Sequence, residues 1–296
     1  MNREKEIYKV TLVGSAGNVA LLTFKFIAGV VGHSSAMIAD AVHSLSDFVT
    51  DLVVLAFVHV SAKPQDASHD YGHGKYETLA SFLIGLALLG AALGILVSGG
   101  LKLAAWAGGE PLEAPGKVAL WAALLSIAVK EALYRYTAIM GRRLDSPAVI
   151  TNAWHHRSDA LSSIGATLGI GGAIVLGDRW TVLDPIASMV VGVMLAKVAV
   201  GLLKANVNEL TDGSLSAEIE NEIIELITSQ PGVSDPHNLR TRRVGNRMAI
   251  EVHVCMDGST TLDESHQRTT MIEQQLKHHF GQNTLVTIHT EPISSL

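Results

Sequence analysis

Six long apolar runs constrain the fold of this chain more than any other feature. The runs lie at about residues 10–31, 36–60, 78–106, 118–140, 148–177 and 182–204. A hydrocarbon core of about 30 Å requires roughly 20 residues of helix to cross it, and each run reaches that length. Hydrophobic residues make up 48% of the chain and charged residues only 17%, a balance typical of membrane proteins. The sequence therefore predicts a polytopic α-helical membrane protein with six transmembrane helices.

Basic residues indicate how these helices are oriented. Lysines and arginines gather before the first run, between the second and third, and after the fourth, whereas the other side has mainly Lys117 and Arg179. By the positive-inside rule, the N-terminus, the basic loops and the C-terminal tail are cytoplasmic. The first run lacks the small-residue cleavage pattern of a signal peptide, so we expect a retained helix. The expected location is a bacterial inner membrane.

The composition changes after residue 212, where polar and apolar residues become mixed and no spanning run follows. Helices are expected at 216–230 and 264–280, and strands at 237–245, 247–257 and 283–291, with a turn at Gly245-Asn246. The order αββαβ predicts a ferredoxin-like α+β domain with helices on one face of a small sheet. We therefore divide the chain into a six-helix transmembrane domain, residues 1–212, and a C-terminal cytoplasmic domain, residues 213–296.

Two of the apolar runs carry a histidine and an aspartate one helical turn apart. His43 and Asp47 lie in the second run, and His155 and Asp159 lie in the fifth. Residues four apart on a helix differ by only about 40° in direction, so each pair shares a face. An ionisable residue at bilayer depth costs roughly 2.5–3.5 kcal/mol, which implies partners inside the protein. Two imidazoles and two carboxylates match the number and type of ligands that tetrahedral Zn²⁺ takes.

Other readings of these polar residues stay open at this point. A single His-Asp pair could instead hold two helices together through hydrogen bonds, and it is the presence of two matching pairs that favours a metal site. Asp40 and Asp51 lie within a turn of the His43 and Asp47 pair, on the same face of the second run. There they line an ion pathway or else cap and solvate the helix. His156 points about 100° away from its neighbour, so we expect it to pack or to face water.

A short cytoplasmic loop, DASHDYGHGKYE, offers a second group of metal ligands. Asp66, His69 and His73 are close in sequence, and a loop can gather all three around a surface ion. The alternative is an ordinary solvated turn, because short histidine-containing loops give only a compositional signal.

The tail contains a third set of candidate ligands, four of them on or near its expected strands. These residues are His237, His253, His266, His289 and Glu291. Alternate residues of a strand share a face, so several of them can converge. Any one of these histidines alone would more commonly be a hydrogen-bonded surface or core residue. The single cysteine, Cys255, forms no CxxC pair and provides neither an internal disulfide nor a thiolate cage.

Together these motifs resemble the cation diffusion facilitator family, proton-coupled exporters of divalent transition metals, over nearly the whole chain. The matching segments are HSSAMIADAVHSLSD, SHDYGHGKYE, WHHRSD, HNLRTR, IEVHVCMDG, ESHQ and IHTEP. The resemblance implies a transport site of His43, Asp47, His155 and Asp159, a loop site of Asp66, His69 and His73, and a paired cytoplasmic site of His237, His253, His266, His289 and Glu291. It also implies a homodimer and a charge contact between Lys75 and Asp212.

The ligand set indicates which metal to expect. Some bacterial relatives have Asp where His43 and Glu291 stand here, and a set of two histidines and two aspartates is similar to the zinc-type members. Imidazole suits Zn²⁺, Fe²⁺ and Co²⁺ better than the oxygen-only sites that suit Mn²⁺. We therefore expect a proton-coupled antiporter that exports Zn²⁺ first, with Fe²⁺, Cd²⁺ or Co²⁺ as alternatives. Zn²⁺ or a similar ion is then both substrate and regulator. The exchange for protons follows from the same ligands, since a histidine must lose its proton to bind metal.

Several function classes are disfavoured by the sequence. No HExxH motif is present, so we do not expect an intramembrane zinc protease or any other enzyme. The formal net charge of -6 gives no basis for binding nucleic acid. The expected partners are metal ions, protons, the lipid bilayer and a second copy of the chain. A non-transporting metal-sensing or partner subunit with the same fold stays an alternative.

Overall fold

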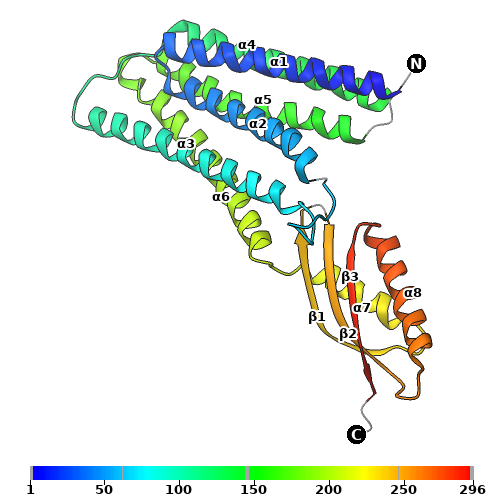
Figure 1. The fold of residues 1–296 in the computed structure, drawn as a ribbon. Helices are drawn as coiled ribbons and strands as arrows, with labels where there is room; N and C mark the ends of the chain where they lie inside the picture. Colours follow the sequence, from blue (N-terminus) through cyan, green and yellow to red (C-terminus); the bar gives the residue numbers. More distant parts are fainter. Residues whose placement is uncertain (1–2, 62, 144–146, 246, 294–296) are drawn as a thin grey trace. The chain divides into compact units, whose positions relative to one another are not determined.

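The computed structural model describes residues 3–61, 63–143, 147–245 and 247–293. For residues 3–8, 11, 50–59, 61, 147–152, 155, 158, 161 and 162, only the backbone is described. Long helices make up most of the described part of the chain between residues 3 and 210 (Figure 1). They are α1 (Arg3–Val31), α2 (Ser35–Ser61), α3 (Lys75–Ala107), α4 (Lys117–Arg143), α5 (Pro147–Val175) and α6 (Leu183–Leu210), with a short 3₁₀ helix, η1 (Asp178–Trp180), before α6. Each apolar run is therefore helical, as predicted.

These helices differ in how apolar they are. By length and composition alone, and within the described residues, three segments could cross a membrane: Leu12–Val31, Lys75–Ala107 and Asp178–Leu210. The other three long helices, α2, α4 and α5, carry most of the ionisable residues at their interior positions. The candidate ligands thus lie on α2 and α5, where ionisable groups at bilayer depth require partners inside the protein.

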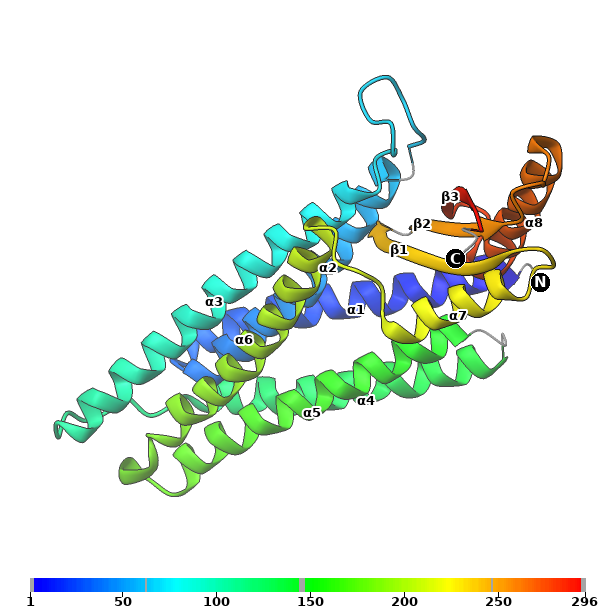
Figure 2. The same ribbon diagram turned by 90° about the horizontal axis from the view of Figure 1, so that it is seen from below.

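Small residues let the helices approach closely in the unit formed by residues 1–52 and 84–201. Its core joins Ala28 of α1, Met37 of α2, Ala123 of α4 and Ala166 of α5. An added Cβ at Gly169 would lie 2.3 Å from the Cβ of Ala187 on α6, so only glycine permits this approach. Figure 2 shows α4 and α5 running side by side, and α1 packs along α4.

A buried carboxylate holds the start of α2 in this unit. Asp184, at the start of α6, accepts hydrogen bonds from Ser34 Oγ at 2.6 Å and from the backbone nitrogen of Ser35 at 2.7 Å. A negative charge at a helix N-terminus satisfies free amide groups and is favoured by the helix dipole. This contact fixes the entry of α2, the helix that carries His43 and Asp47.

The second unit comprises residues 53–83 and 202–296 and contains the small sheet. Its elements are α7 (Ala217–Thr228), β1 (Ser234–Val244), β2 (Arg247–Met256), α8 (Leu262–Phe280) and β3 (Leu285–Pro292), in the predicted order αββαβ (Figure 1). The central strand β2 pairs antiparallel with β1 and parallel with β3. The fold class predicted from the sequence is thereby confirmed.

The two faces of this sheet have different roles. Alternate residues of β2, including Ile250 and Val252, are buried against Ile223 of α7 and Ile272 of α8. Both helices therefore cover one face, and the residues between, such as His253, lie on the other. The boundary that we place after residue 212 stays a prediction.

Candidate metal centres

Three of the four predicted intramembrane ligands converge. His43 and Asp47 of α2 and Asp159 of α5 each offer a ligand atom within 4.8 Å of the others. The His43 Nε2 atom lies 4.0 Å from Asp47 Oδ2, as expected for residues one helical turn apart. Asp159 is buried, whereas the two α2 ligands are partly exposed. The side chain of the fourth predicted ligand, His155, lies outside the described residues.

Sequence reasoning missed a lysine that contacts this group. Lys130 of α4 is buried, and its Nζ lies 2.6 Å from Asp159 Oδ2 and 3.0 Å from Asn18 Oδ1. The signal was present in the sequence, because a lysine near the middle of the 118–140 run requires a partner inside the protein. Which carboxylate is the partner of this lysine depends on how α4 is rotated against α5.

Asp40 forms a second buried ion pair. Its carboxylate lies 2.7 Å from Lys25 Nζ, with both side chains 1% exposed, and it accepts a hydrogen bond from Ser163 Oγ at 3.0 Å. The readings that we left open for Asp40, an ion pathway or a helix cap, stay predictions. Asp51, whose side chain lies outside the described residues, stays open. His156 is buried beside Gly14, in agreement with the expected packing role.

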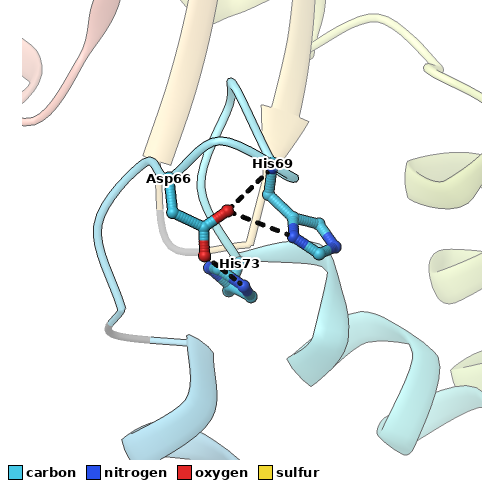
Figure 3. A group of neighbouring side chains, drawn as sticks. All are labelled: Asp66, His69 and His73. Atoms are coloured by element: carbon cyan, nitrogen blue, oxygen red, sulfur yellow. Dashed lines mark hydrogen bonds and ion pairs between the residues drawn. The ribbon is translucent and has the colours of Figure 1, made fainter.

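The loop ligands form a compact group around one carboxylate. Figure 3 shows Asp66 between the two imidazoles, with Oδ1 3.6 Å from His69 Nδ1 and Oδ2 3.5 Å from His73 Nε2. Ser68 donates hydrogen bonds to Asp66 from its hydroxyl and backbone nitrogen, and these bonds lower the pKa of Asp66 to about 2. The carboxylate is therefore ionised at neutral pH and available to a cation. Asp66, His69 and His73 lie close enough to share one ion.

Strand register explains the group in the cytoplasmic domain. His237 on β1 is paired with His253 on β2, and His253 is paired with His289 on β3, so three imidazoles form a row on the face opposite the core. Ring centroids are 5.4 Å apart for the first pair and 4.6 Å for the second. Cross-strand neighbours interact directly, and no sequence spacing alone could show that these three are neighbours. We call these residues the histidine row.

Glu291 contacts all three imidazoles of the histidine row. Its carboxylate accepts a hydrogen bond from His253 Nδ1 at 2.8 Å and lies 3.5 Å from His237 Nε2 and 3.7 Å from His289 Nε2. The His253 hydrogen bond is the main reason that the pKa of Glu291 is lowered. The pKa of His237 is raised, mainly by its hydrogen bond to the carbonyl of Asp235 and further by Glu291. His237, His253 and Glu291 together lie within reach of one ion.

Two further residues, His266 and Cys255, bear on the cytoplasmic site. His266 is exposed on α8, which packs on the core face, so the sheet separates it from the histidine row within one chain. Cys255, which we set aside, lies with Asp235 and His237 in another convergent group. Burial, with Asp235 and Glu291 contributing, raises the pKa of the Cys255 thiol and disfavours the thiolate that binds metal.

The predicted contact between Lys75 and Asp212 is confirmed. Lys75 Nζ lies 2.7 Å from Asp212 Oδ1, and this hydrogen bond lowers the pKa of Asp212. Glu209 adds a second tie, since it accepts from Thr78 Oγ1 at 2.7 Å and from the backbone nitrogen of Gly245 at 2.9 Å. Within the unit of residues 53–83 and 202–296, the start of α3, the end of α6 and the β1–β2 turn are thereby joined.

Comparisons with known proteins indicate the family of this chain. The cation efflux transmembrane domain family matches residues 11–211, and the cation efflux protein cytoplasmic domain family matches residues 215–293. The manganese efflux system protein MneP of Bacillus subtilis is 32% identical over 98% of this chain and 97% of that protein. Metal tolerance protein C1 of Arabidopsis thaliana is 33% identical over 96% of this chain and 62% of that protein.

A solved structure is similar over the cytoplasmic part alone. The metal-bound C-terminal domain of the CzcD transporter from Thermotoga maritima is 29% identical over 27% of this chain and 92% of that chain, with a TM-score of 0.25. The two family matches together span nearly all of the chain, from residue 11 to residue 293. The chain therefore belongs to the cation efflux, or cation diffusion facilitator, family of divalent metal exporters.

Proposed function

We propose that this protein exports Zn²⁺ from the cytoplasm in exchange for protons, with Fe²⁺, Cd²⁺ and Co²⁺ as alternative cargo. The observation that carries the proposal is the convergence of His43, Asp47 and Asp159 inside the helical unit. His155, one turn before Asp159 on the same helix, is the fourth ligand of the proposed transport site. The termini lie in the cytoplasm, and the membrane is the inner membrane of a bacterium.

Charge supports a divalent cation as the cargo. The carboxylates of Asp47 and Asp159 together carry the two negative charges that a divalent ion requires in a medium of low dielectric constant. Neutral imidazoles add ligand atoms without changing that balance. Because an imidazole binds metal only after it loses its proton, metal loading and proton uptake compete for the same histidines, which couples the two fluxes.

Manganese is the competing cargo. The relative from Bacillus subtilis is named a manganese efflux protein. The imidazole of His43 nevertheless makes this ligand set softer than the oxygen-rich sites that Mn²⁺ prefers, which is why we place zinc first. Transport of the two ions by the same preparation distinguishes these candidates.

We assign the loop and tail groups to regulation of a homodimer. The histidine row with Glu291 binds a regulatory ion on the exposed face of the sheet, and Asp66, His69 and His73 bind another. His266, which the family resemblance assigns to the cytoplasmic site, stays a proposed member of it. We assign no catalytic step to any of these groups. The alternative function is a metal-sensing subunit of the same fold that does not transport.

Zinc uptake into proteoliposomes tests the proposal. The purified protein is reconstituted with a zinc-sensitive dye inside, a proton gradient is imposed, and uptake is compared for the parental protein, Asp47→Asn and Asp159→Asn. The matched control is Glu131→Gln, which removes a carboxylate of α4 that pairs with Arg135 at the helix surface. We expect uptake by the parental protein and the control only. Uptake by both aspartate variants at the parental rate would refute the transport site, and no uptake by the folded parental protein would favour the sensing subunit.

A further inference from the structure

The carboxylate of Asp159 already holds a cation that belongs to the chain. Its Oδ2 lies 2.6 Å from the ammonium of Lys130, and the two side chains are 8% and 4% exposed. Asn18 of α1 accepts a second hydrogen bond from the same ammonium at 3.0 Å. Asp159 also belongs to the group that converges with His43 and Asp47. One carboxylate is therefore shared between a lysine and the proposed transport site.

A metal ion and this ammonium would compete for Asp159. Two cations a few ångströms apart repel each other strongly where the effective dielectric constant is below that of water. We therefore expect a divalent ion that binds Asp159 to displace the ammonium from contact with Oδ2. Asn18 provides an uncharged oxygen that continues to hold the lysine when it leaves the carboxylate.

The charge balance gives this arrangement a consequence for transport. With neutral imidazoles, Asp47 and Asp159 carry two negative charges, which the ammonium reduces to one in the metal-free site. Because the cost of burying a net charge rises with its square, halving that charge lowers the cost to about a quarter. With a divalent ion bound and the ammonium still nearby, the net charge of the site is one positive unit. Without Lys130 it would be zero. Lys130 thus makes the empty site easier to bury and the loaded site less tightly held.

We propose that Lys130 is a tethered counter-cation of the transport site, which the incoming metal displaces from Asp159 and which returns as the metal leaves. This inference rests on the proposed transport function. Lys130 acts through Asp159 and is a positioning residue rather than a metal ligand. Its presence weakens metal binding and speeds release and return, so it raises both the KM and the maximal rate.

Lys25 provides a matched comparison within the same unit. It is as deeply buried as Lys130 and lies 2.7 Å from its own carboxylate partner, Asp40. Among the described residues, Asp40 is not part of the group that converges with Asp159. Removing the charge of Lys25 therefore tests whether any buried ammonium has the same effect on transport.

The experiment measures the KM and maximal rate of zinc uptake in proteoliposomes for the full chain. Lys130→Gln keeps a hydrogen-bond donor but removes the charge, and we expect about a tenfold lower KM, equivalent to about 1.4 kcal/mol, together with a reduced maximal rate. Lys130→Arg keeps the charge and should restore both values toward those of the parental protein. Lys25→Gln should leave the KM near the parental value. A structural role alone would lower the rate without lowering the KM.

A second variant tests the inference even if Lys130→Gln is not recovered in a folded form. Asn18→Ala removes the alternative hydrogen bond, so the ammonium is left on Asp159 and the KM should rise, the opposite sign to Lys130→Gln. An unchanged KM in these variants, or an equal fall in Lys25→Gln, would overturn the inference. If Asp159→Asn transports normally, the transport site itself is wrong, and that outcome is separate from any result at Lys130.

Discussion

Replacing Asp159 with asparagine should both stop transport and destabilise the protein, and the structure indicates how to separate the two effects. The substitution removes the charged partner of Lys130, whose Nζ lies 2.6 Å from Asp159 Oδ2. The buried ammonium then keeps its hydrogen bond to the neutral oxygen of Asn18 but loses its negatively charged partner at position 159. Loss of activity in the single variant is therefore ambiguous by itself.

The magnitude follows from the burial of the pair. Breaking a buried ion pair by removing one partner typically costs about 3–5 kcal/mol, because the remaining charge is uncompensated. With the pair 8% and 4% exposed, screening by water gives little relief. A loss of that size lowers the Tm by on the order of 10 °C in a chain of this length. The double variant Asp159→Asn with Lys130→Gln removes both charges and should regain most of that stability.

Thermal unfolding of the detergent-solubilised protein, followed by size-exclusion chromatography, measures the first effect, and zinc uptake into proteoliposomes measures the second. We expect the single variant to be unstable and inactive, and the double variant to be stable and still inactive. A single variant with the parental Tm would refute the buried charge pair. Transport by the stable double variant would refute the assignment of Asp159 as a ligand.

Three further predictions concern metal choice, the cytoplasmic site and the junction. His43→Asp replaces an imidazole with a harder carboxylate, so uptake of Mn²⁺ relative to Zn²⁺ should rise, and an unchanged ratio would assign selectivity elsewhere. Glu291→Gln removes the carboxylate that contacts His237, His253 and His289. Calorimetry of the full chain should therefore show weaker zinc binding at the cytoplasmic site, whereas the control Asp257→Asn, outside the row, should leave zinc binding unchanged. Asp212→Asn should lower the Tm at neutral pH. Because Lys75 depresses the pKa of Asp212 below its unfolded value of 3.8, the carboxylate stabilises the fold above that pH, and the Tm difference should vanish as the pH falls through the lower, folded pKa. A Tm difference that does not shrink as the pH falls below 3.8 would contradict this account.

Local patterns in the sequence were sufficient for the elements of this fold. The apolar runs predicted each long helix because burial in lipid demands roughly 20 consecutive apolar residues, a property of neighbouring positions. The order αββαβ followed from changes of hydrophobic period between short segments. The spacing of His43 and Asp47 predicted a shared helix face for the same reason, since four residues make about one turn.

Contacts between elements were decided only by the tertiary structure. Nothing in the sequence showed that Lys130 faces Asp159 or that Lys25 faces Asp40, because a helix period fixes a face but not the neighbour toward which it turns. The histidine row depends on strand register, where a shift of one residue would move His253 to the core face. His266 was grouped with that row through the family resemblance of its segment, whereas α8, which carries it, packs against the opposite face of the sheet. Residue spacing along the chain thus determined the candidate ligands, whereas helix rotation and strand register determined which of them meet.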